Sequence, residues 1–563
     1  MSTETAATAA PAVPMVNVQI DGVWLQFPKG TRVIEACSQA SKFIPRYCYH
    51  PKLSSPGNCR MCMIEMGMPK MTPDRKPVIG ADGKPEIAWI PRPQISCAQD
   101  VAEGMGIRTD SPMVQDCRKG VMEFLLINHP LDCPICDQAG ECRLQEFSVE
   151  YGQGESRFLE HKVKKPKSVE LGPRVTLDAE RCILCTRCIR FMQEVAKDDV
   201  LGIVDRGSFN SIACHPDRIL DSNYSLNTVD ICPVGALTST DFRFKMRVWF
   251  LKETKTIDVN CGTGSNILIG ARENKIYRIT PRENNDVNGV WLPDSHRLNF
   301  KYVGDERRLK SPTIKGQTVE WRTAVAIAGE ILKSKASSQL WVVASGRQTN
   351  EELFLTKRLI KALGIDKQHD IVPRLGSADG LLIDADRNPN TSGAKLLGLT
   401  TGKPGGRLKK FVEGVRSGAI KVVITLGEDL TKTGLTEEDL AKLEAIIAVD
   451  ILPNKTTPHA TIVLPGSAWV EKRGSMINTR GRLQRLNRAV DAPGEAHDDW
   501  EILRDLIQIV SGSNGLYMIE DVFKSMAGEV KELAGLSLSK IGDLGVRVVQ
   551  EKAPEPETAE VAK

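Results

Sequence analysis

The cysteines of this chain are confined to one part of it. All 15 lie between Cys37 and Cys261, and the 302 residues that follow contain none. In a reducing cytosol, a dense block of cysteines indicates metal binding or catalysis rather than disulfides. The chain is therefore expected to divide at about residue 260, with the metal chemistry in its first half.

The remaining composition limits the classes of partner. With 75 basic and 71 acidic residues, the chain has no bulk charge that would attract nucleic acid or an anionic membrane. No apolar run approaches the length that crosses a bilayer. The first residues lack the features of a secretory signal or a mitochondrial presequence. We expect a protein of several domains, made in a cytosol, with no nucleic-acid partner and no membrane span.

The first candidate metal site has the spacing C-x10-C-x2-C, followed by another cysteine after 34 residues. Its members are Cys48, Cys59, Cys62 and Cys97. Plant-type [2Fe–2S] ferredoxins hold their cluster in a loop of similar design. A predicted β-hairpin and helix precede it and suit a ferredoxin-like β-grasp. Backbone N–H groups near Gly57 could point at the sulfurs and help set the potential. Cys37 competes with Cys97, but we interpret it as a buried thiol on the predicted helix.

The second candidate site is the stretch HPLDCPICDQAGEC, residues 129–142. Its potential ligands are His129, Cys133, Cys136 and Cys142. A structural zinc ion would accept this set as a tetrahedron. An iron–sulfur cluster would accept three thiolates and, less commonly, an imidazole. The stretch alone leaves both chemistries open.

The third site is CILCTRC with a remote Cys-Pro pair, and its members are Cys182, Cys185, Cys188 and Cys232. Bacterial [4Fe–4S] ferredoxins use C-x2-C-x2-C and a Cys-Pro cysteine, whereas zinc ribbons use paired C-x2-C knuckles. The spacing therefore predicts a [4Fe–4S] cluster. With iron–sulfur motifs on both sides, the His129 stretch is also best interpreted as a cluster site. Four cysteines are left over, and Cys117 and Cys214 are expected to be structural.

The order of these motifs over residues 16–250 closely resembles the large iron–sulfur subunit family of bacterial NADH–quinone oxidoreductase, respiratory complex I. This resemblance implies one [2Fe–2S] cluster on the first group and one [4Fe–4S] cluster on each of the other two. The second half, in ATIVLPGSAWVEKRGSMINTRGRLQRL, resembles the molybdopterin oxidoreductase superfamily. The complex I family keeps that domain without a molybdenum cofactor. Here no cysteine is available there as a molybdenum ligand, which leaves serine and aspartate as the remaining ligand types.

One motif of the family departs from its pattern. Many members carry a further [4Fe–4S] site at the start of the second half, and the corresponding positions here are Asp258, Cys261, Ser265 and Pro293. Only one of these is a thiol, and proline cannot ligate. We therefore predict that the fourth cluster is absent and that Cys261 is a relic.

The predicted fold class is multidomain α+β and α/β. The expected segments are a disordered tail (1–15), a [2Fe–2S] ferredoxin-like domain (16–110), a helical segment with the His/Cys site (111–165), a [4Fe–4S] ferredoxin-like domain (166–255), a small β module (256–315), an α/β molybdopterin-oxidoreductase-like domain without cofactor (316–545) and a disordered tail (546–563). Buried-strand patterns alternate with helical stretches in the second half, which predicts a parallel sheet.

The resemblance implies an electron-relay subunit with no catalytic residue of its own. A partner subunit would oxidise NADH with FMN, and a small ferredoxin-like two-cluster subunit would take the electrons towards quinone. The complex would lie on the cytoplasmic side of a bacterial inner membrane, with this subunit peripheral. No G-x-G-x-x-G fingerprint follows a strand, so NADH is not expected to bind here. The alternatives are an iron–sulfur subunit of an NAD-linked hydrogenase or formate dehydrogenase, and a non-redox zinc scaffold.

Overall fold

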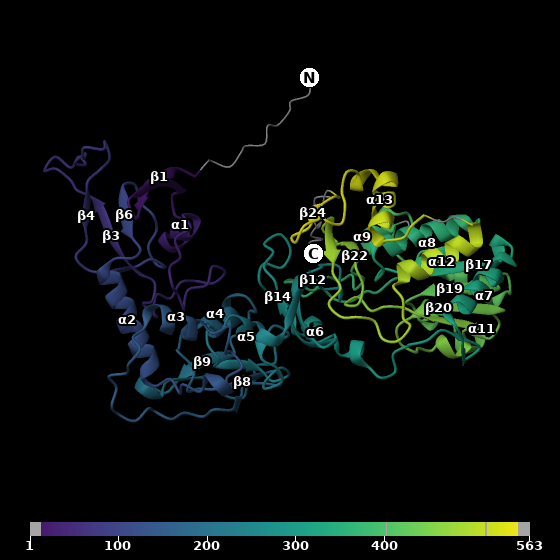
Figure 1. Ribbon diagram of the computed structural model, residues 1–563, viewed down its shortest axis with the longest axis horizontal. Helices are drawn as coiled ribbons and strands as arrows, with labels where there is room; N and C mark the ends of the chain where they lie inside the picture. Colours follow the sequence, from purple (N-terminus) through teal and green to yellow (C-terminus); the bar gives the residue numbers. More distant parts are fainter. Residues whose placement is uncertain (1–12, 401, 513–514, 550–563) are drawn as a thin grey trace, which may run out of the picture. The chain divides into compact units, whose positions relative to one another are not determined.

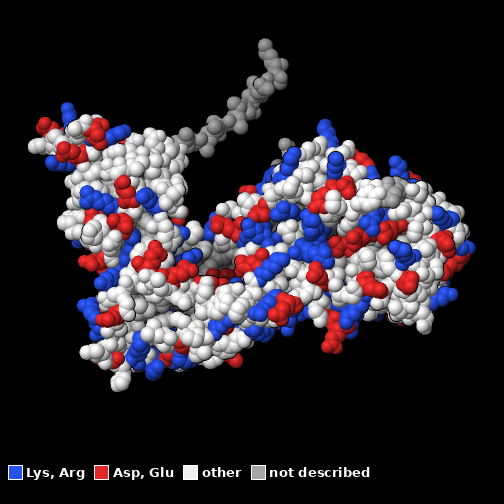
Figure 2. All heavy atoms as spheres, in the orientation of Figure 1, with Lys and Arg blue, Asp and Glu red and all other residues white. Residues whose placement is uncertain are grey.

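The computed structural model describes residues 13–400, 402–512 and 515–549, and it divides into two compact units, Met1–Trp249 and Phe250–Lys563 (Figure 1). The division comes before the expected residue 260, because β12 (Lys252–Ile257) already pairs with β13 in the second unit. None of the helices among the described residues is both long enough and apolar enough to cross a membrane. On the face drawn in Figure 2, acidic and basic side chains are interspersed.

The first unit opens with a mixed sheet of strand order β2-β1-β6-β3-β4, to which β5 is joined through β3. Its strands are β1 Met15–Ile20, β2 Val23–Pro28, β3 Met63–Pro69, β4 Ile87–Trp89, β5 Gln94–Ile95 and β6 Met105–Arg108. The predicted hairpin turns at Asp21 and Gly22, both with positive φ, which is the backbone of a two-residue type I′ loop. α1 (Val33–Gln39) follows the hairpin. The expected tail of residues 1–15 is too long, because Met15 already pairs with Pro28, whereas residues 1–12 lie outside the described residues.

Two helices form the segment that carries the His/Cys stretch. α2 (Pro112–Ile127) is capped by Ser111, whose side chain accepts the Val114 N–H, and proline at the first helical position suits a helix start. It ends two residues before His129. α3 (Arg143–Tyr151) begins immediately after Cys142. The helices therefore position the first and the last residue of this stretch.

The rest of the first unit consists of short elements around the third cysteine group. They are β7 Val169–Glu170, β8 Val175–Leu177, α4 Arg187–Glu194, β9 Leu201–Val204, β10 Ser211–Cys214, α5 Asn227–Asp230 and β11 Leu237–Ser239. One three-stranded sheet has the order β11-β8-β7, and β9 pairs with β10. Cys188 lies on α4, and Cys232 lies in the connection between α5 and β11. This group therefore takes its cysteines from two separate segments of the chain.

The second unit begins with the predicted small β module. β12, β13 (Asn266–Arg272) and β14 (Lys275–Pro281) form an antiparallel meander, and the four-residue helix α6 (Asp294–Arg297) follows. The isoleucines of these strands pack with Trp469 and Leu486 from much later in the chain. The module therefore shares its core with the α/β domain.

A seven-stranded sheet forms the centre of the second unit, in the order β16-β15-β21-β20-β19-β17-β18. Its strands are β15 Thr313–Ile314, β16 Gln317–Thr318, β17 Leu340–Ser345, β18 His369–Val372, β19 Val422–Leu426, β20 Ala445–Asp450 and β21 Ile462–Pro465. β17 to β21 are parallel, as predicted, and β17 is buried along its whole length. Such strands read as continuous apolar runs because helices cover both faces.

The helices divide between those two faces according to the alternation of the strands. Val342 packs in one core with α7, α8 and α12, and Val343 packs in another with α10 and α11. The helices of the unit are α7 Trp321–Lys333, α8 Asn350–Ala362, α9 Thr391–Leu396, α10 Leu408–Arg416, α11 Glu437–Leu440, α12 Asp499–Ser511 and α13 Ile519–Glu529. This is the layering of a doubly wound α/β domain.

A small sheet closes the second unit and corrects the predicted end of the domain. β22 (Gly474–Ile477) and β23 (Arg482–Leu486) form a hairpin, and β24 (Val546–Arg547) pairs with β23. The expected disordered tail of residues 546–563 is therefore wrong at its start, because backbone pairing fixes residues 546–547. Residues 550–563 lie outside the described residues.

Candidate metal centres

The structure brings the four cysteines of the first group together from three loops. The Cys48 N–H donates to Cys59 Sγ at 3.5 Å. Cys62 and Cys97 share a side-chain hydrogen bond, and Cys97 has a second one with Cys48. Three of the four are buried and Cys59 is partly exposed. These thiols therefore form one continuous sulfur group beside the first sheet.

Left-handed backbone shapes the loop that carries Cys59. Gly57 has φ +62, a conformation that favours glycine, and a Cβ there would lie 2.8 Å from Ile95 Cδ1 and would displace the end of that side chain. Arg60 also has a positive φ. The next residue, Met61, directs its N–H at the Cys59 sulfur. Successive N–H groups in such a turn stabilise negative charge, as a thiolate or a cluster requires.

Cys37 and Cys97 differ in their contacts with the other cysteines of the first group. Cys37 lies on α1 and is completely buried, and burial, with a smaller contribution from Asp21, raises the pKa of its thiol to about 12. Cys97 is the residue that contacts Cys48 and Cys62. The geometry therefore joins Cys97, rather than Cys37, to the group.

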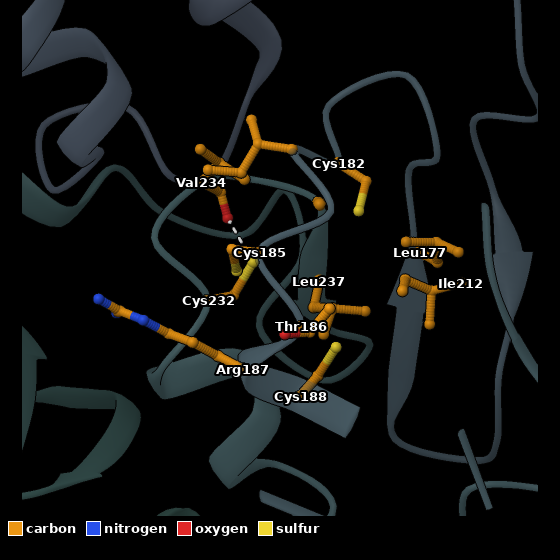
Figure 3. Close-up of a pocket in the computed structure, with 12 residues that line it drawn as sticks. Leu177, Cys182, Cys185, Thr186, Arg187, Cys188, Ile212, Cys232, Val234 and Leu237 are labelled. Carbon is orange, nitrogen blue, oxygen red and sulfur yellow. Dashed lines mark hydrogen bonds between the residues drawn. The ribbon is translucent and has the colours of Figure 1, made fainter. Parts of the chain in front are cut away.

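The cysteines of the third group line one cavity (Figure 3). They surround it together with apolar side chains that include Leu177, Ile212 and Val234. Leu184 and Thr186, between the cysteines, have positive φ, and the Leu184 N–H donates to Cys182 Sγ at 3.4 Å. Cys232 Sγ donates to the Val234 carbonyl at 3.0 Å, as the dashed line marks. Burial raises the pKa of Cys185 to about 12, so bound cations are needed to hold this many thiolates in so enclosed a place.

The second group contains three neighbouring thiols, and His129 lies beside the same charged side chains as one of them. Cys142 is within electrostatic reach of Cys133 and Cys136. His129 and Cys136 share two charged neighbours, Asp132 and Arg181. Burial lowers the pKa of His129 to about 4. The imidazole is therefore uncharged at neutral pH, which is the form that ligates a metal.

A partly buried ion pair holds the second group against the third. Arg181, the residue before Cys182, donates from Nε and Nη2 to the two carboxylate oxygens of Asp132 at 3.1 and 2.8 Å. Burial opposes ionisation of Asp132, but Arg181 and Lys167 outweigh it and bring its pKa to about 2. Such bidentate pairs fix geometry as well as charge. The pair therefore sets the distance between the two loops.

The loop after Cys232 also lies against the second group. The Arg143 N–H donates to the Pro233 carbonyl at 3.1 Å. A Cβ on Gly235 would lie only 2.2 Å from Cys136 Sγ. Glycine is thus required where this loop passes the sulfur, and the second and third groups are immediate neighbours.

Two arginines of α4 connect the third group with the first. Arg190 Nη2 donates to the Cys48 carbonyl and Arg187 Nη2 to the Tyr49 carbonyl, both at 2.6 Å. The guanidinium of Arg187 is within electrostatic reach of Cys185 and Cys232 of the third group and of Cys48 and Cys59 of the first. The third group therefore lies beside both of the others.

These contacts include residues that our sequence analysis missed. Arg187 lies inside the run CILCTRC, and an arginine between two cysteines was the signal that could have identified it. Gly235 and Asp132 have no comparable local signal, because their partners are far away in the sequence. Cys117 is partly exposed on α2, and Cys214 Sγ donates to the Leu171 carbonyl at 3.3 Å.

Of the positions that correspond to a fourth cluster, Asp258 and Cys261 lie close together, and both are buried. A single thiol does not fit a cubane, which takes four ligands and usually four thiolates. His296, three residues beyond Pro293, joins these two side chains. Sequence reasoning did not find His296, since a lone histidine carries no spacing signal.

A cavity of about 80 Å³ lies at the carboxyl edge of the parallel sheet in the second unit. It is lined by residues at the ends of β17, β19 and β20, and by Arg347, Trp469 and Lys472. Lys472 is already paired with Glu352 at 2.8 Å and Asp499 at 3.2 Å. Pockets for cofactors typically measure about 300–1,000 Å³. The cavity is therefore smaller than a typical cofactor pocket.

The fold and these groups define an iron–sulfur protein of the multi-cluster ferredoxin class, joined to an α/β domain of the molybdopterin oxidoreductase type. Five family models match in the same order. They are "2Fe-2S iron-sulfur cluster binding domain" (13–112), "NADH-ubiquinone oxidoreductase-G iron-sulfur binding region" (118–157), "NADH-quinone oxidoreductase subunit 3, ferredoxin-like domain" (172–238), "NADH-ubiquinone oxidoreductase NDSU1/NuoG-like, 4Fe-4S domain" (251–301) and "Molybdopterin oxidoreductase" (385–509).

The chain belongs to the family of the large iron–sulfur subunit of NADH-quinone oxidoreductase and its mitochondrial counterparts. It is 34% identical to the family member of Rickettsia bellii over 88% of this chain and 72% of that protein. It is 30% identical to the 78 kDa subunit of Candida albicans NADH-ubiquinone oxidoreductase, over 97% of this chain and 88% of that protein. A match of 41% identity to the NADH-quinone oxidoreductase family member of Rickettsia conorii covers 62% of this chain and about half, 49%, of that protein.

Proposed function

We propose that this chain is the electron-relay subunit of an NADH–quinone oxidoreductase. It would hold one [2Fe–2S] cluster and two [4Fe–4S] clusters, each of which, when bound, supplies a one-electron carrier. The proposed ligands are Cys48, Cys59, Cys62 and Cys97 for [2Fe–2S]; His129, Cys133, Cys136 and Cys142 for one [4Fe–4S]; and Cys182, Cys185, Cys188 and Cys232 for the other. The observation that carries the proposal is the gathering of eleven cysteines into three neighbouring groups in one unit, with a neutral histidine that shares charged neighbours with the second group.

The chain's own residues would tune these sites. Arg187 supplies positive charge to two groups at once, and positive charge favours the reduced state of a cluster. Backbone N–H groups at Met61 and Leu184 donate towards sulfur, which acts in the same direction. At the second group, the neutral imidazole of His129 replaces an anionic thiolate, which raises the potential of a cluster.

The contacts also support an order for the relay. Arg187 joins the first and third groups, and the loop from Pro233 to Gly235 joins the third and second groups. We propose that the third group is the intermediate station between the first and the second. Short distances between neighbouring sites are what a relay without a substrate pocket requires.

We propose that the second unit carries no molybdenum cofactor and that the fourth cluster is absent. The small cavity at the sheet edge, the paired Lys472 and the lack of any cysteine after Cys261 support the first statement. The single thiol among the four corresponding positions supports the second. The second unit would then serve as architecture.

By family membership, we propose an FMN- and NADH-binding subunit as the electron donor and a small ferredoxin-like two-cluster subunit as the acceptor. Other subunits of the peripheral arm would be further partners of this chain. The complex would be attached to the cytoplasmic side of a bacterial inner membrane. These partners would contribute the NADH and quinone chemistry, and this chain would contribute the path between them.

The first test is iron and acid-labile sulfide analysis of anaerobically purified protein, with EPR of the dithionite-reduced sample. We expect about ten iron atoms per chain, with one [2Fe–2S] signal and two [4Fe–4S] signals. Cys136→Ala should remove one [4Fe–4S] signal, whereas Cys214→Ala, at a leftover cysteine, should remove none. About six iron atoms and one zinc ion would contradict the proposal at the His129 stretch.

A second test addresses the partners. NADH should reduce the clusters of this chain only after the FMN-binding subunit has been added, and a small two-cluster acceptor should then reoxidise them. Reduction by NADH in the absence of the FMN-binding subunit would overturn the assignment of NADH oxidation to a partner.

A further inference from the structure

Three buried side chains with three different donor atoms converge at the start of the second unit. Asp258 follows β12, Cys261 lies in the loop beyond it, and His296 lies on α6. Their carboxylate oxygen, sulfur and ring nitrogen all lie within 4.8 Å of one another. Relative exposures are 2% for Asp258, 0% for Cys261 and 8% for His296. The cluster is therefore enclosed by protein, unlike an acidic patch on a surface.

The surrounding hydrogen bonds hold the donors in place. The Asp258 N–H donates to the Ser265 carbonyl at 2.8 Å and closes the loop that carries Cys261. Asn260 Nδ2 donates to Asp258 Oδ1 at 2.5 Å, and the second oxygen, Oδ2, faces His296 Nδ1 at 2.7 Å. Partners of this kind orient the ligands of metal sites.

The donor set selects one class of metal ion. Calcium and magnesium bind almost entirely through oxygen, so a thiol and an imidazole argue against them. Zinc accepts cysteine, histidine and aspartate alike, and ions of similar preference include cobalt(II) and nickel(II). A divalent ion would also balance the two negative charges of the Asp258 carboxylate and a Cys261 thiolate in a place where unpaired charge is costly.

The charged side chains around His296 include both signs. Besides Asp258, Arg387 and Asp379 act electrostatically on His296, and they carry opposite charges. The Cys261 sulfur lies 3.9 Å from the Leu382 carbonyl. The charge of an ion would therefore be balanced mainly by its ligands.

We propose that Asp258, Cys261 and His296 bind one divalent transition-metal ion of the zinc class, at the place where the fourth cluster motif retains a single thiol. The ion would tie the loop after β12 to α6 and would act as a structural clip. Its tetrahedral shell would be completed by one further ligand from outside this set. The proposal is independent of the proposed electron relay, because it concerns zinc in the second unit and the relay concerns iron in the first.

The test uses the full holoprotein, purified anaerobically without chelators, incubated with one equivalent of zinc chloride and dialysed. Elemental analysis should give about one zinc ion per chain in addition to the cluster iron. Zinc K-edge X-ray absorption should show a single sulfur at about 2.3 Å, with nitrogen or oxygen neighbours at about 2.0–2.2 Å. Cys261→Ala and His296→Ala should each weaken zinc binding by about tenfold or more, while Cys214→Ala should leave it unchanged.

Several results would overturn the proposal. These are a fully iron-loaded protein that retains no zinc, a zinc shell with no sulfur or with several sulfurs, and zinc binding that survives Cys261→Ala. About four additional iron atoms with a further cluster signal would also overturn it, since the site would then hold a cubane. A variant that loses the first unit's iron is judged unfolded. In that case, the number of sulfur ligands in the zinc K-edge X-ray absorption spectrum of the unmodified protein tests the proposal.

Discussion

Replacing Gly235 with alanine should release the cluster proposed at the His129 group. A Cβ at this position would lie 2.2 Å from Cys136 Sγ and 3.1 Å from Gln138 Cβ, whereas ordinary contacts begin at 3.4 Å. The sulfur or the loop must therefore move by more than about 1 Å, while metal–ligand bonds tolerate about 0.2 Å. Cys136 cannot accommodate the new methyl group and remain a ligand.

The expected result is loss of about four of about ten iron atoms per chain, with one [4Fe–4S] EPR signal missing and the [2Fe–2S] signal retained. Overpacking should also lower the free energy of unfolding by about 1–3 kcal/mol. The measurements are iron analysis, EPR of the reduced protein and thermal unfolding.

Gly120→Ala is the matched control, because Gly120 lies within α2 and a Cβ there would meet nothing within 4 Å. It should keep all its iron and gain up to about 1 kcal/mol of helix stability. The reasoning is refuted if Gly235→Ala keeps its iron and both [4Fe–4S] signals, or if Gly120→Ala loses them as well.

Three further outcomes are expected. Arg187→Met should lower the reduction potentials of both the first and third sites by on the order of tens of millivolts in an EPR redox titration. Arg187→Lys keeps the positive charge and should shift the potentials less. Unchanged potentials in Arg187→Met would contradict the shared role of this guanidinium. Arg308 donates two hydrogen bonds to the carboxylate of Glu471, at 2.8 and 2.7 Å. Glu471→Gln should lower the free energy of unfolding, measured with a chemical denaturant, by about 3 kcal/mol, because it leaves the Arg308 charge buried and unpaired. A decrease below about 1 kcal/mol would refute this reasoning. Burial raises the pKa of Glu351 to about 7 from 4.5, although Ser475 hydrogen bonds oppose the rise. The pKa of Glu351 is higher in the folded state than in the unfolded state, so the folded state binds this proton more tightly. The contribution of the protonated Glu351 to the free energy of unfolding is therefore complete below pH 4.5 and is lost as the pH rises to about 7. Glu351→Gln should flatten the pH dependence of the thermal midpoint, and an unchanged profile would count against it.

The sequence by itself determined the features that depend on short stretches of chain. The β-hairpin before the first cysteine group, the helical segment that carries the His129 stretch and the run of apolar parallel strands were all predictable, because turn chemistry and periodicity are local. The cysteine spacings also identified the family. Ligands separated by two residues occupy one loop, so their closeness follows from chain geometry alone.

Tertiary structure decided what joins those stretches. The choice of Cys97 over Cys37, the placement of Arg187 between two groups and the need for glycine at 235 all depend on which loops pack together. The same holds for His296, which reaches Asp258 and Cys261 across more than 30 residues of intervening chain. The tail boundaries were misjudged for the same reason, since Val546 is held in a strand by pairing with Leu483, 63 residues earlier. Contacts between distant segments are fixed by packing of the whole unit, and spacing along the chain does not encode them.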